Sequence, residues 1–264
     1  MLILIVLVSA SAVVLAQSAP AAPQPVATAV VGIGVVALDP AADSSAPASM
    51  AGRPASINGS GFFVSKQGHV ITALHVLRAA ERAREQMRGT ENRLFVGLRA
   101  GTSFVPVPAE VVGVDEAHDL ALLRIKSPAP RLNVVKLSAV RPDDGALIEA
   151  AGLPGMTGMA LVSNTGHMAS MVLLQPGNRL LKAPSEIDAA RLAPLREFYL
   201  ADLKSDEGMS GGPVYLVESG AVIGVVQGYT QDPRLAVLVP ARNVIELLKS
   251  NNVGYDELPP HQPE

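Results

Sequence analysis

The sequence contains no cysteine and no tryptophan, and aromatic residues make up only 3% of its 264 positions. Without cysteine the chain has no disulfide framework, no thiolate zinc site and no cysteine nucleophile. So few aromatic rings argue against a platform on which single-stranded nucleic acid would stack. Charge is also scarce: 21 Lys and Arg against 24 Asp and Glu give a net charge of −3, and there is no basic cluster, so we expect no nucleic-acid partner.

Aliphatic and turn-forming residues dominate what is there, with 48% hydrophobic residues, 23 Gly and 21 Pro. Helical patterns are confined to residues 76–89, which end at Gly89, and residues 241–250. No helix alternates with the strands, so the pattern predicts two antiparallel barrels or a sandwich rather than a parallel α/β sheet. The strand-like segments are residues 28–38, 61–72 (as a hairpin), 94–99, 104–107, 111–114, 119–125, 147–151, 160–163, 171–174, 198–203, 213–217, 222–226 and 235–239.

The N-terminus predicts export. Residues 2–16 carry no charge and are short for a membrane-spanning helix, which needs about 20 residues, but they fit the apolar part of a signal peptide. Small residues precede Gln17, where cleavage is expected; an uncleaved membrane anchor and a buried N-terminal segment are the alternatives. Residues 17–27 contain three prolines and predict an extended linker. We therefore expect an extracytoplasmic protein that is periplasmic, secreted or membrane-anchored.

Three polar residues stand beside strand-like segments. His75 follows one such segment, Asp119 begins another, and Ser210 lies in the glycine-rich run GMSGG. Each alone is more often structural. Together they predict nucleophilic catalysis, because a serine hydroxyl needs a base within reach and the base needs a carboxylate to fix its tautomer.

The glycines around Ser210 fit the same chemistry. Attack on a carbonyl creates an oxyanion, and two backbone amides of a tight turn can stabilise it. We expect the amides of Gly208 and Ser210 to form this oxyanion hole. We also expect Gly211 and Gly212 to let a substrate backbone approach closely.

Two other motifs match without their structural context. Residues 208–212 fit the G-x-S-x-G nucleophile elbow, but Pro213 and a strand-like run follow instead of a helix, and the only later histidine is His261. Residues 32–37 fit a dinucleotide-binding pattern, but a Pro/Ala/Ser-rich loop follows them. No histidines have metal-ligand spacing. We expect neither a cofactor nor a metal ion.

Taken in order, these motifs resemble those of trypsin-like (chymotrypsin-fold) serine proteases, and among them the HtrA/Deg-type bacterial envelope proteases. The resemblance covers about residues 28–250 and is carried by GSGFFV, TALHV, DLALL and GMSGGP, which begin at residues 59, 72, 119 and 208. It implies an all-β fold of two antiparallel six-stranded barrels, at about residues 28–127 and 144–240, with a short C-terminal helix. Residues 251–264 are expected to be a polar tail, with no peptide-binding PDZ module.

The resemblance also implies roles for single residues. His75 would be the general base and then acid, Asp119 its orienting carboxylate and Ser210 the nucleophile. Residues 225–228 would pair with the substrate backbone and line the specificity pocket, which points to Val226 and Gly228. Lys204 lies near the pocket floor of digestive relatives and could favour an acidic side chain; the alternative is a solvent-facing loop lysine.

Several residues depart from the family pattern or remain outside it. Met209 replaces the usual Asp or Asn before the serine, and Leu74 replaces a small residue before the histidine. His118 is expected to face solvent, because neighbouring strand residues point to opposite faces. His69 and His167 are expected to be structural.

The sequence thus predicts a serine endopeptidase that cleaves protein or peptide substrates through an acyl-enzyme, with no nucleic-acid partner. The alternative is a non-catalytic peptide-binding module on the same barrels, in which Met209 and Leu74 have impaired the site.

Overall fold

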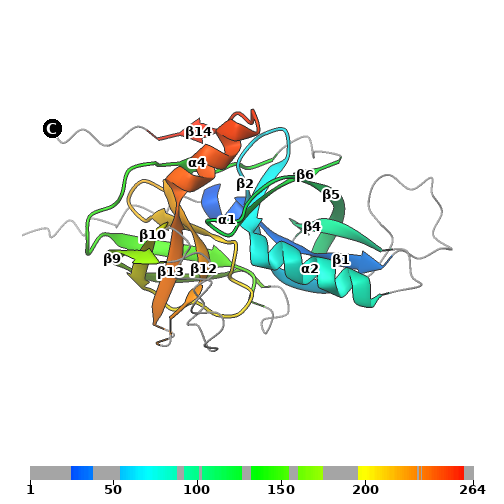
Figure 1. Cartoon of the computed structure of the whole chain (residues 1–264), viewed down its shortest axis with the longest axis horizontal. Coiled ribbons are helices and arrows are strands. Elements are labelled where there is room, and N and C mark those ends of the chain that lie inside the picture. The colour runs from blue at the N-terminus through cyan, green and yellow to red at the C-terminus, as the bar shows by residue number, and fades with distance from the viewer. Residues whose placement is uncertain are drawn as a thin grey trace, which may run out of the picture.

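A computed structural model describes residues 25–37, 54–87, 92–100, 103–126, 132–154, 160–174, 196–230, 232 and 234–258. Most of its strands form two barrels that lie side by side along the long axis of the molecule (Figure 1). The prediction of two six-stranded antiparallel barrels is confirmed. None of the helices in these ranges combines the length and apolar character needed to cross a bilayer. The expected signal peptide or anchor lies outside the described residues.

The first barrel is closed by pairing of its first and fourth strands, in the order β1-β2-β3-β6-β5-β4. Its strands are β1 (Val30–Ala37), β2 (Pro54–Phe63), β3 (His69–Ala73), β4 (Asn92–Ala100), β5 (Ser103–Asp115) and β6 (Leu120–Ile125). The helix α2 (Leu74–Gln86) follows β3 directly, two residues earlier than the pattern predicts. It ends before Met87, and the predicted C-cap Gly89 lies outside the described residues.

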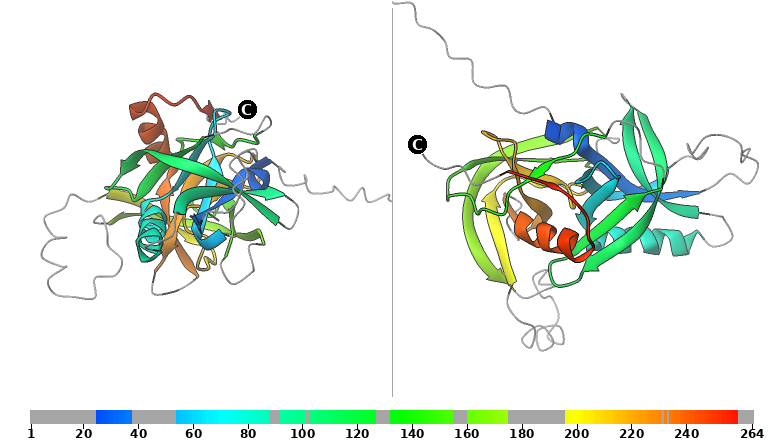
Figure 2. Two further views of the ribbon diagram at one scale, coloured as in Figure 1. Left: turned by 90° about the vertical axis from the view of Figure 1, so that its right-hand side faces the viewer. Right: turned by 90° about the horizontal axis from the view of Figure 1, so that it is seen from above.

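The second barrel runs in the order β11-β8-β9-β10-β13-β12 and closes because β11 also pairs with β12. Its strands are β8 (Leu147–Gly152), β9 (Val162–Leu174), β10 (Arg196–Asp202), β11 (Pro213–Leu216), β12 (Val222–Tyr229) and β13 (Leu235–Pro240). The two-residue strand β7 (Lys136–Leu137) joins β12 in parallel. The helix α4 (Ala241–Ser250) has the predicted bounds and contacts both barrels at their junction (Figure 2).

Two strands are longer than predicted because each serves two partners. β5 pairs with β4 up to Pro108 and with β6 from Ala109 onward. Likewise β9 pairs first with β8 and then with β10, and the change occurs at His167. Each was expected as two separate strands, so the apolar pattern is interrupted near the residues where the strand changes neighbour.

Mostly aliphatic side chains fill three cores, one inside each barrel and one between the barrels. Alternation along β6 explains its unbroken apolar run: Leu120 and Leu122 face the core between the barrels, whereas Leu123 faces the interior of the first barrel. The junction is therefore built of apolar contacts that include strands from both barrels and α4.

Both ends of the described chain are more ordered than the sequence predicts. The short helix α1 (Pro25–Ala29) lies partly in the expected linker, and Val26 is buried in the core between the barrels. At the other end, Val253 joins the same core and β14 (Asp256–Glu257) pairs with β7. The first residues of the expected polar tail therefore pack and pair with the rest of the fold.

Candidate active site

His75 occupies the first turn of α2, and Asp119 holds this turn through three contacts, two of them to His75. The Asp119 carbonyl accepts the Leu74 amide at 2.8 Å, Oδ1 accepts the His75 amide at 2.8 Å, and Oδ2 lies 2.5 Å from His75 Nδ1. Because a carboxylate only accepts hydrogen bonds, the Nδ1 atom carries the proton and the Nε2 atom of the neutral ring is left with its lone pair. The side chains of His75 and Asp119 remain 25% and 21% exposed, so the pair is accessible from solvent.

Asp119 itself has a backbone φ of 55°, in the left-handed region that non-glycine residues seldom adopt. The preceding turn is held by Asp115, whose Oδ1 accepts the amides of Ala117 and His118 at 2.9 and 3.2 Å. His118 Nδ1 lies 2.6 Å from Asp115 Oδ2, and the His118 side chain is only 16% exposed. The expectation that His118 faces solvent is wrong, because residues 116–119 form a turn rather than a strand.

Burial of the Asp115 carboxyl opposes its ionisation and raises its pKa. The hydrogen bonds and charge of His118, with the Ala117 amide, outweigh that effect, so the pKa of Asp115 lies below its ordinary value. The turn before Asp119 is thus stabilised by an ionised Asp115 carboxylate that is hydrogen-bonded to His118.

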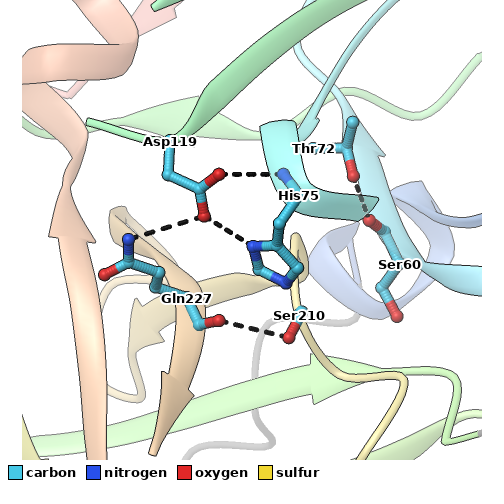
Figure 3. Close-up of polar contacts among 6 residues, drawn as sticks. All are labelled: Ser60, Thr72, His75, Asp119, Ser210 and Gln227. Carbon is cyan, nitrogen blue, oxygen red and sulfur yellow. Dashed lines mark hydrogen bonds and ion pairs between the residues drawn. The ribbon is translucent and has the colours of Figure 1, made fainter. Parts of the chain in front are cut away.

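Ser210 lies on the loop between β10 and β11 of the second barrel. Its carbonyl accepts the Ser60 amide at 2.9 Å, which fastens this loop to β2 of the first barrel. Its Oγ donates to the Gln227 carbonyl at 3.2 Å. In Figure 3, Ser210 lies on the side of the imidazole away from Asp119, and no hydrogen bond joins the drawn Ser210 side chain to His75.

Gln227 lies within residues 225–228, which the resemblance assigns to substrate binding, but its contacts with Asp119 and Ser210 were not predicted. Its Nε2 donates to Asp119 Oδ2 at 3.4 Å, while its carbonyl holds the Ser210 hydroxyl (Figure 3). One residue of β12 therefore contacts both the carboxylate and the serine. The only sequence signal is a polar residue in the apolar run VIGVVQGY.

The turn around Ser210 contains the two backbone amides that are expected to form an oxyanion hole. Gly208 has a φ of 96°, and the intervening Met209 amide donates to the Asp206 carbonyl at 3.1 Å. Among the described residues, the amides of Gly208 and Ser210 find no acceptor, so both are available to a ligand oxygen. These are the two amides that the sequence analysis selected.

The next two glycines serve packing rather than substrate approach. A Cβ at Gly211, whose φ is 84°, would lie 2.2 Å from the Ser60 carbonyl oxygen. A Cβ at Gly212 would lie 2.2 Å from the Ala151 carbonyl oxygen. The expectation for these glycines is wrong in its reason, because the backbone that comes close belongs to the protein itself.

The three residues expected to bind substrate are placed differently from one another. Val226 is fully buried in the second barrel, and its amide and carbonyl bond to Gly212 and Gly211 at 2.9 and 2.8 Å. Gly228 borders open space, since a Cβ there would meet nothing within 4 Å. The Lys204 side chain is 69% exposed and lies 3.2 Å from Asp206, as the solvent-facing alternative predicts.

The two departures from the family pattern are absorbed by the cores. Met209 is fully buried and packs in the second barrel. Leu74 is buried in the first barrel. Neither bulky side chain therefore occupies the space between His75 and Ser210.

Comparison with known proteins matches residues 59–225 to the model of a trypsin-like peptidase domain. The chain is 32% identical over 188 residues to the uncharacterized protein y4bJ of Sinorhizobium fredii, which covers 71% of this chain and 24% of that protein. It is 30% identical over 170 residues to the chloroplastic Protease Do-like 1 of Arabidopsis thaliana, covering 64% of this chain and 32% of the relative. A probable periplasmic DegP-like serine endoprotease of Chlamydia pneumoniae is 27% identical, with 64% and 28% covered. The chain spans only about a quarter to a third of the length of these relatives.

Solved structures share the fold at low sequence identity. The active form of the Rv3671c protease of M. tuberculosis has a TM-score of 0.58 at 22% identity, with 95% of this chain and 96% of that chain covered. The apo MamO protease domain of Magnetospirillum magneticum has a TM-score of 0.58 at 20% identity, with 84% and 97% covered. The matched family domain includes the segments that carry His75, Asp119 and Ser210, so the chain belongs to the trypsin-like peptidase family.

Proposed function

We propose that the protein is a serine endopeptidase in which Ser210 is the nucleophile, His75 the general base and acid, and Asp119 the orienting carboxylate. One observation carries this proposal: Asp119 holds both the backbone and the ring of His75 through Nδ1, which leaves Nε2 free on the side of Ser210. A serine beside such a ring gains a base that it lacks in water.

The reaction begins with rotation of the Ser210 hydroxyl from the Gln227 carbonyl toward His75. Oγ then attacks the peptide carbonyl carbon while Nε2 takes the Oγ proton, and Asp119 stabilises the resulting imidazolium. The carbonyl π electrons move to the oxygen, which receives hydrogen bonds from the amides of Gly208 and Ser210. Collapse of this intermediate breaks the C–N bond, Nε2 protonates the departing amine, and an acyl-enzyme remains.

Water completes the cycle by the same steps. The water oxygen attacks the ester carbon while His75 Nε2 takes a proton from the water. His75 then returns that proton to Ser210 Oγ as the acid product leaves. The Asp119 bonds keep the ring in one orientation through both halves of the cycle. No resident metal or cofactor has a step in this scheme.

The substrates we propose are proteins or peptides bound in extended form along β12. Gly228 supports this because it borders open space, and its half-buried backbone adjoins Gln227 at the site. The exposed Lys204 gives no support to a preference for acidic side chains. We propose an extracytoplasmic location, in keeping with the periplasmic DegP-like relatives.

Covalent labelling tests the function directly. A fluorophosphonate probe should label the purified full chain at neutral pH on Ser210, and Ser210→Ala should abolish both labelling and casein cleavage. Ser219→Ala is the matched control, since Ser219 lies in the exposed turn between β11 and β12 and should leave both unchanged. A wild-type protein that is never labelled but still binds unfolded casein would favour the peptide-binding module.

A further inference from the structure

Ser60 is a fully buried hydroxyl residue of β2 that the chemistry above does not use. Its Oγ donates to the Gly208 carbonyl at 2.6 Å and accepts the Leu153 amide at 2.8 Å. Its own amide donates to the Ser210 carbonyl at 2.9 Å, and its carbonyl accepts Thr72 Oγ1 at 2.7 Å (Figure 3). Every polar group of this residue is therefore satisfied, and three of its four bonds reach the second barrel.

The Oγ bond fixes one particular peptide group. The carbonyl of the Gly208–Met209 peptide points to Ser60, and the N–H of the same peptide donates to Asp206 at 3.1 Å. The amides of Gly208 and Ser210 belong to the peptides immediately before and after it. The direction of this central peptide therefore decides whether the two amides converge on one point.

Glycine makes this direction easy to lose. Gly208 has a φ of 96°, and a residue without a Cβ can rotate its peptide between several allowed conformations. The Met209 side chain is anchored in the second barrel, so rotation at Gly208 is the freedom that remains. A hydrogen bond from a rigid neighbour removes that freedom.

β2 is close enough to provide such a bond with a short side chain. A Cβ on the preceding Gly59 would lie 3.0 Å from the Ser210 carbonyl oxygen, and a Cβ on Gly61 would lie 2.8 Å from the Ile71 carbonyl oxygen. The strand is thus pressed against both the serine loop and β3. A serine is the smallest side chain that carries a hydroxyl across this contact.

We propose that Ser60 is a positioning residue whose hydroxyl locks the Gly208–Met209 peptide, so that the amides of Gly208 and Ser210 converge as an oxyanion hole. This inference rests on the proposed endopeptidase function, since it concerns the same amides. It makes the first barrel a contributor to transition-state stabilisation through the second. Ser60 does not touch the substrate.

The test compares Ser60→Ala with Ser65→Ala in the full chain. Both serines are buried in the first barrel, but the Ser65 hydroxyl bonds only within its own turn, to His69. With a fluorescent peptide taken from a casein cleavage site, Ser60→Ala should lower kcat by about 10-fold to 100-fold with KM nearly unchanged, a smaller loss than deletion of a whole oxyanion donor. Binding of a peptidyl boronic acid should weaken by a similar factor, because this inhibitor uses the oxyanion hole. Ser65→Ala should change neither value.

Two further measurements keep the inference decidable. Ser60→Cys preserves the shape with a weaker donor and should fall between the parent and Ser60→Ala, which covers the case of an unfolded alanine variant. A crystal structure of either variant should show the Gly208 carbonyl turned from its present direction. Wild-type kcat and boronate affinity in folded Ser60→Ala, or an unturned peptide, would overturn the positioning role alone. An unlabelled wild-type protein would instead overturn the endopeptidase proposal, and the peptide direction in the variant structure would still decide the role of Ser60.

Discussion

The two halves of the site are held in different ways. In the first barrel, His75 and Asp119 are joined by hydrogen bonds of 2.8 and 2.5 Å within one compact unit of strand, turn and helix. In the second barrel, Ser210 lies on a loop whose contacts come largely from other elements, through Ser60 of β2 and Gln227 of β12.

This difference indicates that the alignment of Ser210 with His75 depends on the junction between the barrels. The base and its carboxylate are positioned by contacts within the first barrel. The serine depends on the junction, and its hydroxyl points to a backbone carbonyl of β12 at 3.2 Å. We therefore expect changes in the first half to abolish chemistry without unfolding, and changes at the junction to lower both stability and chemistry.

The largest effect should follow from Asp119→Asn, which breaks the first half alone. The asparagine oxygen can still accept the His75 amide, but its NH₂ group cannot accept the Nδ1 proton, so the ring is driven to the tautomer with Nε2 protonated. We expect kcat to fall by about 10⁴-fold with the fold retained. Peptide hydrolysis and thermal unfolding check this, with exposed Asp144→Asn as the control. A kcat within 10-fold of the parent value would refute the assignment of Asp119.

The next effect should come from Gly211→Ala, which breaks the junction. The new Cβ would meet the Ser60 carbonyl oxygen at 2.2 Å, and the residue would also keep a φ of 84°. Gly145 has the same φ but nothing within 4 Å, so Gly145→Ala isolates the backbone penalty. We expect a loss of about 1 kcal/mol in the free energy of unfolding for Gly145→Ala and about 3 kcal/mol or more for Gly211→Ala. Equal losses in denaturant titrations would show that the junction is not tightly packed there.

The smallest effect should come from Asp115→Asn, which alters the turn that precedes Asp119 in the first half. Asp115 is more acidic in the folded protein than in the unfolded chain, so its ionisation stabilises the fold above the unfolded pKa near 3.8. That contribution is lost as the pH falls through the lower folded pKa. We expect Asp115→Asn to reduce the free energy of unfolding by about 1 kcal/mol at pH 7 and by less at pH 3. A deficit that grows on acidification would contradict the charged state assigned to the turn.

Much of the architecture was predictable because it follows local patterns. The bounds of α4 and the succession of short strands come from periodicity and turn residues. These patterns left two barrels or a sandwich open, and the family resemblance implied the two closed barrels that the structure has. The three polar residues singled out by their order along the chain also lie at one junction, with Asp119 on His75 and Ser210 beyond the ring.

What escaped prediction depends on contacts between distant segments. Nothing local indicates that Ser60 donates to Gly208 or that Gln227 reaches Asp119. The prediction for His118 was wrong because it assumed a strand, whereas His118 lies in a turn and its ring is hydrogen-bonded to Asp115 at the end of β5. When a residue owes its role to a neighbour far along the chain, no local periodicity in the sequence indicates that role.

The aliphatic core between the barrels has a consequence for any attempt to divide the molecule. Side chains from the N-terminal half, such as Leu122, are shielded by others from the far half, such as Val225, and by α4. A fragment cut between the barrels would expose this apolar surface to water. The hydrophobic effect would then drive the two pieces to reassociate or to aggregate. We therefore expect two fragments divided between the barrels to be poorly soluble alone and to reassemble when they are mixed.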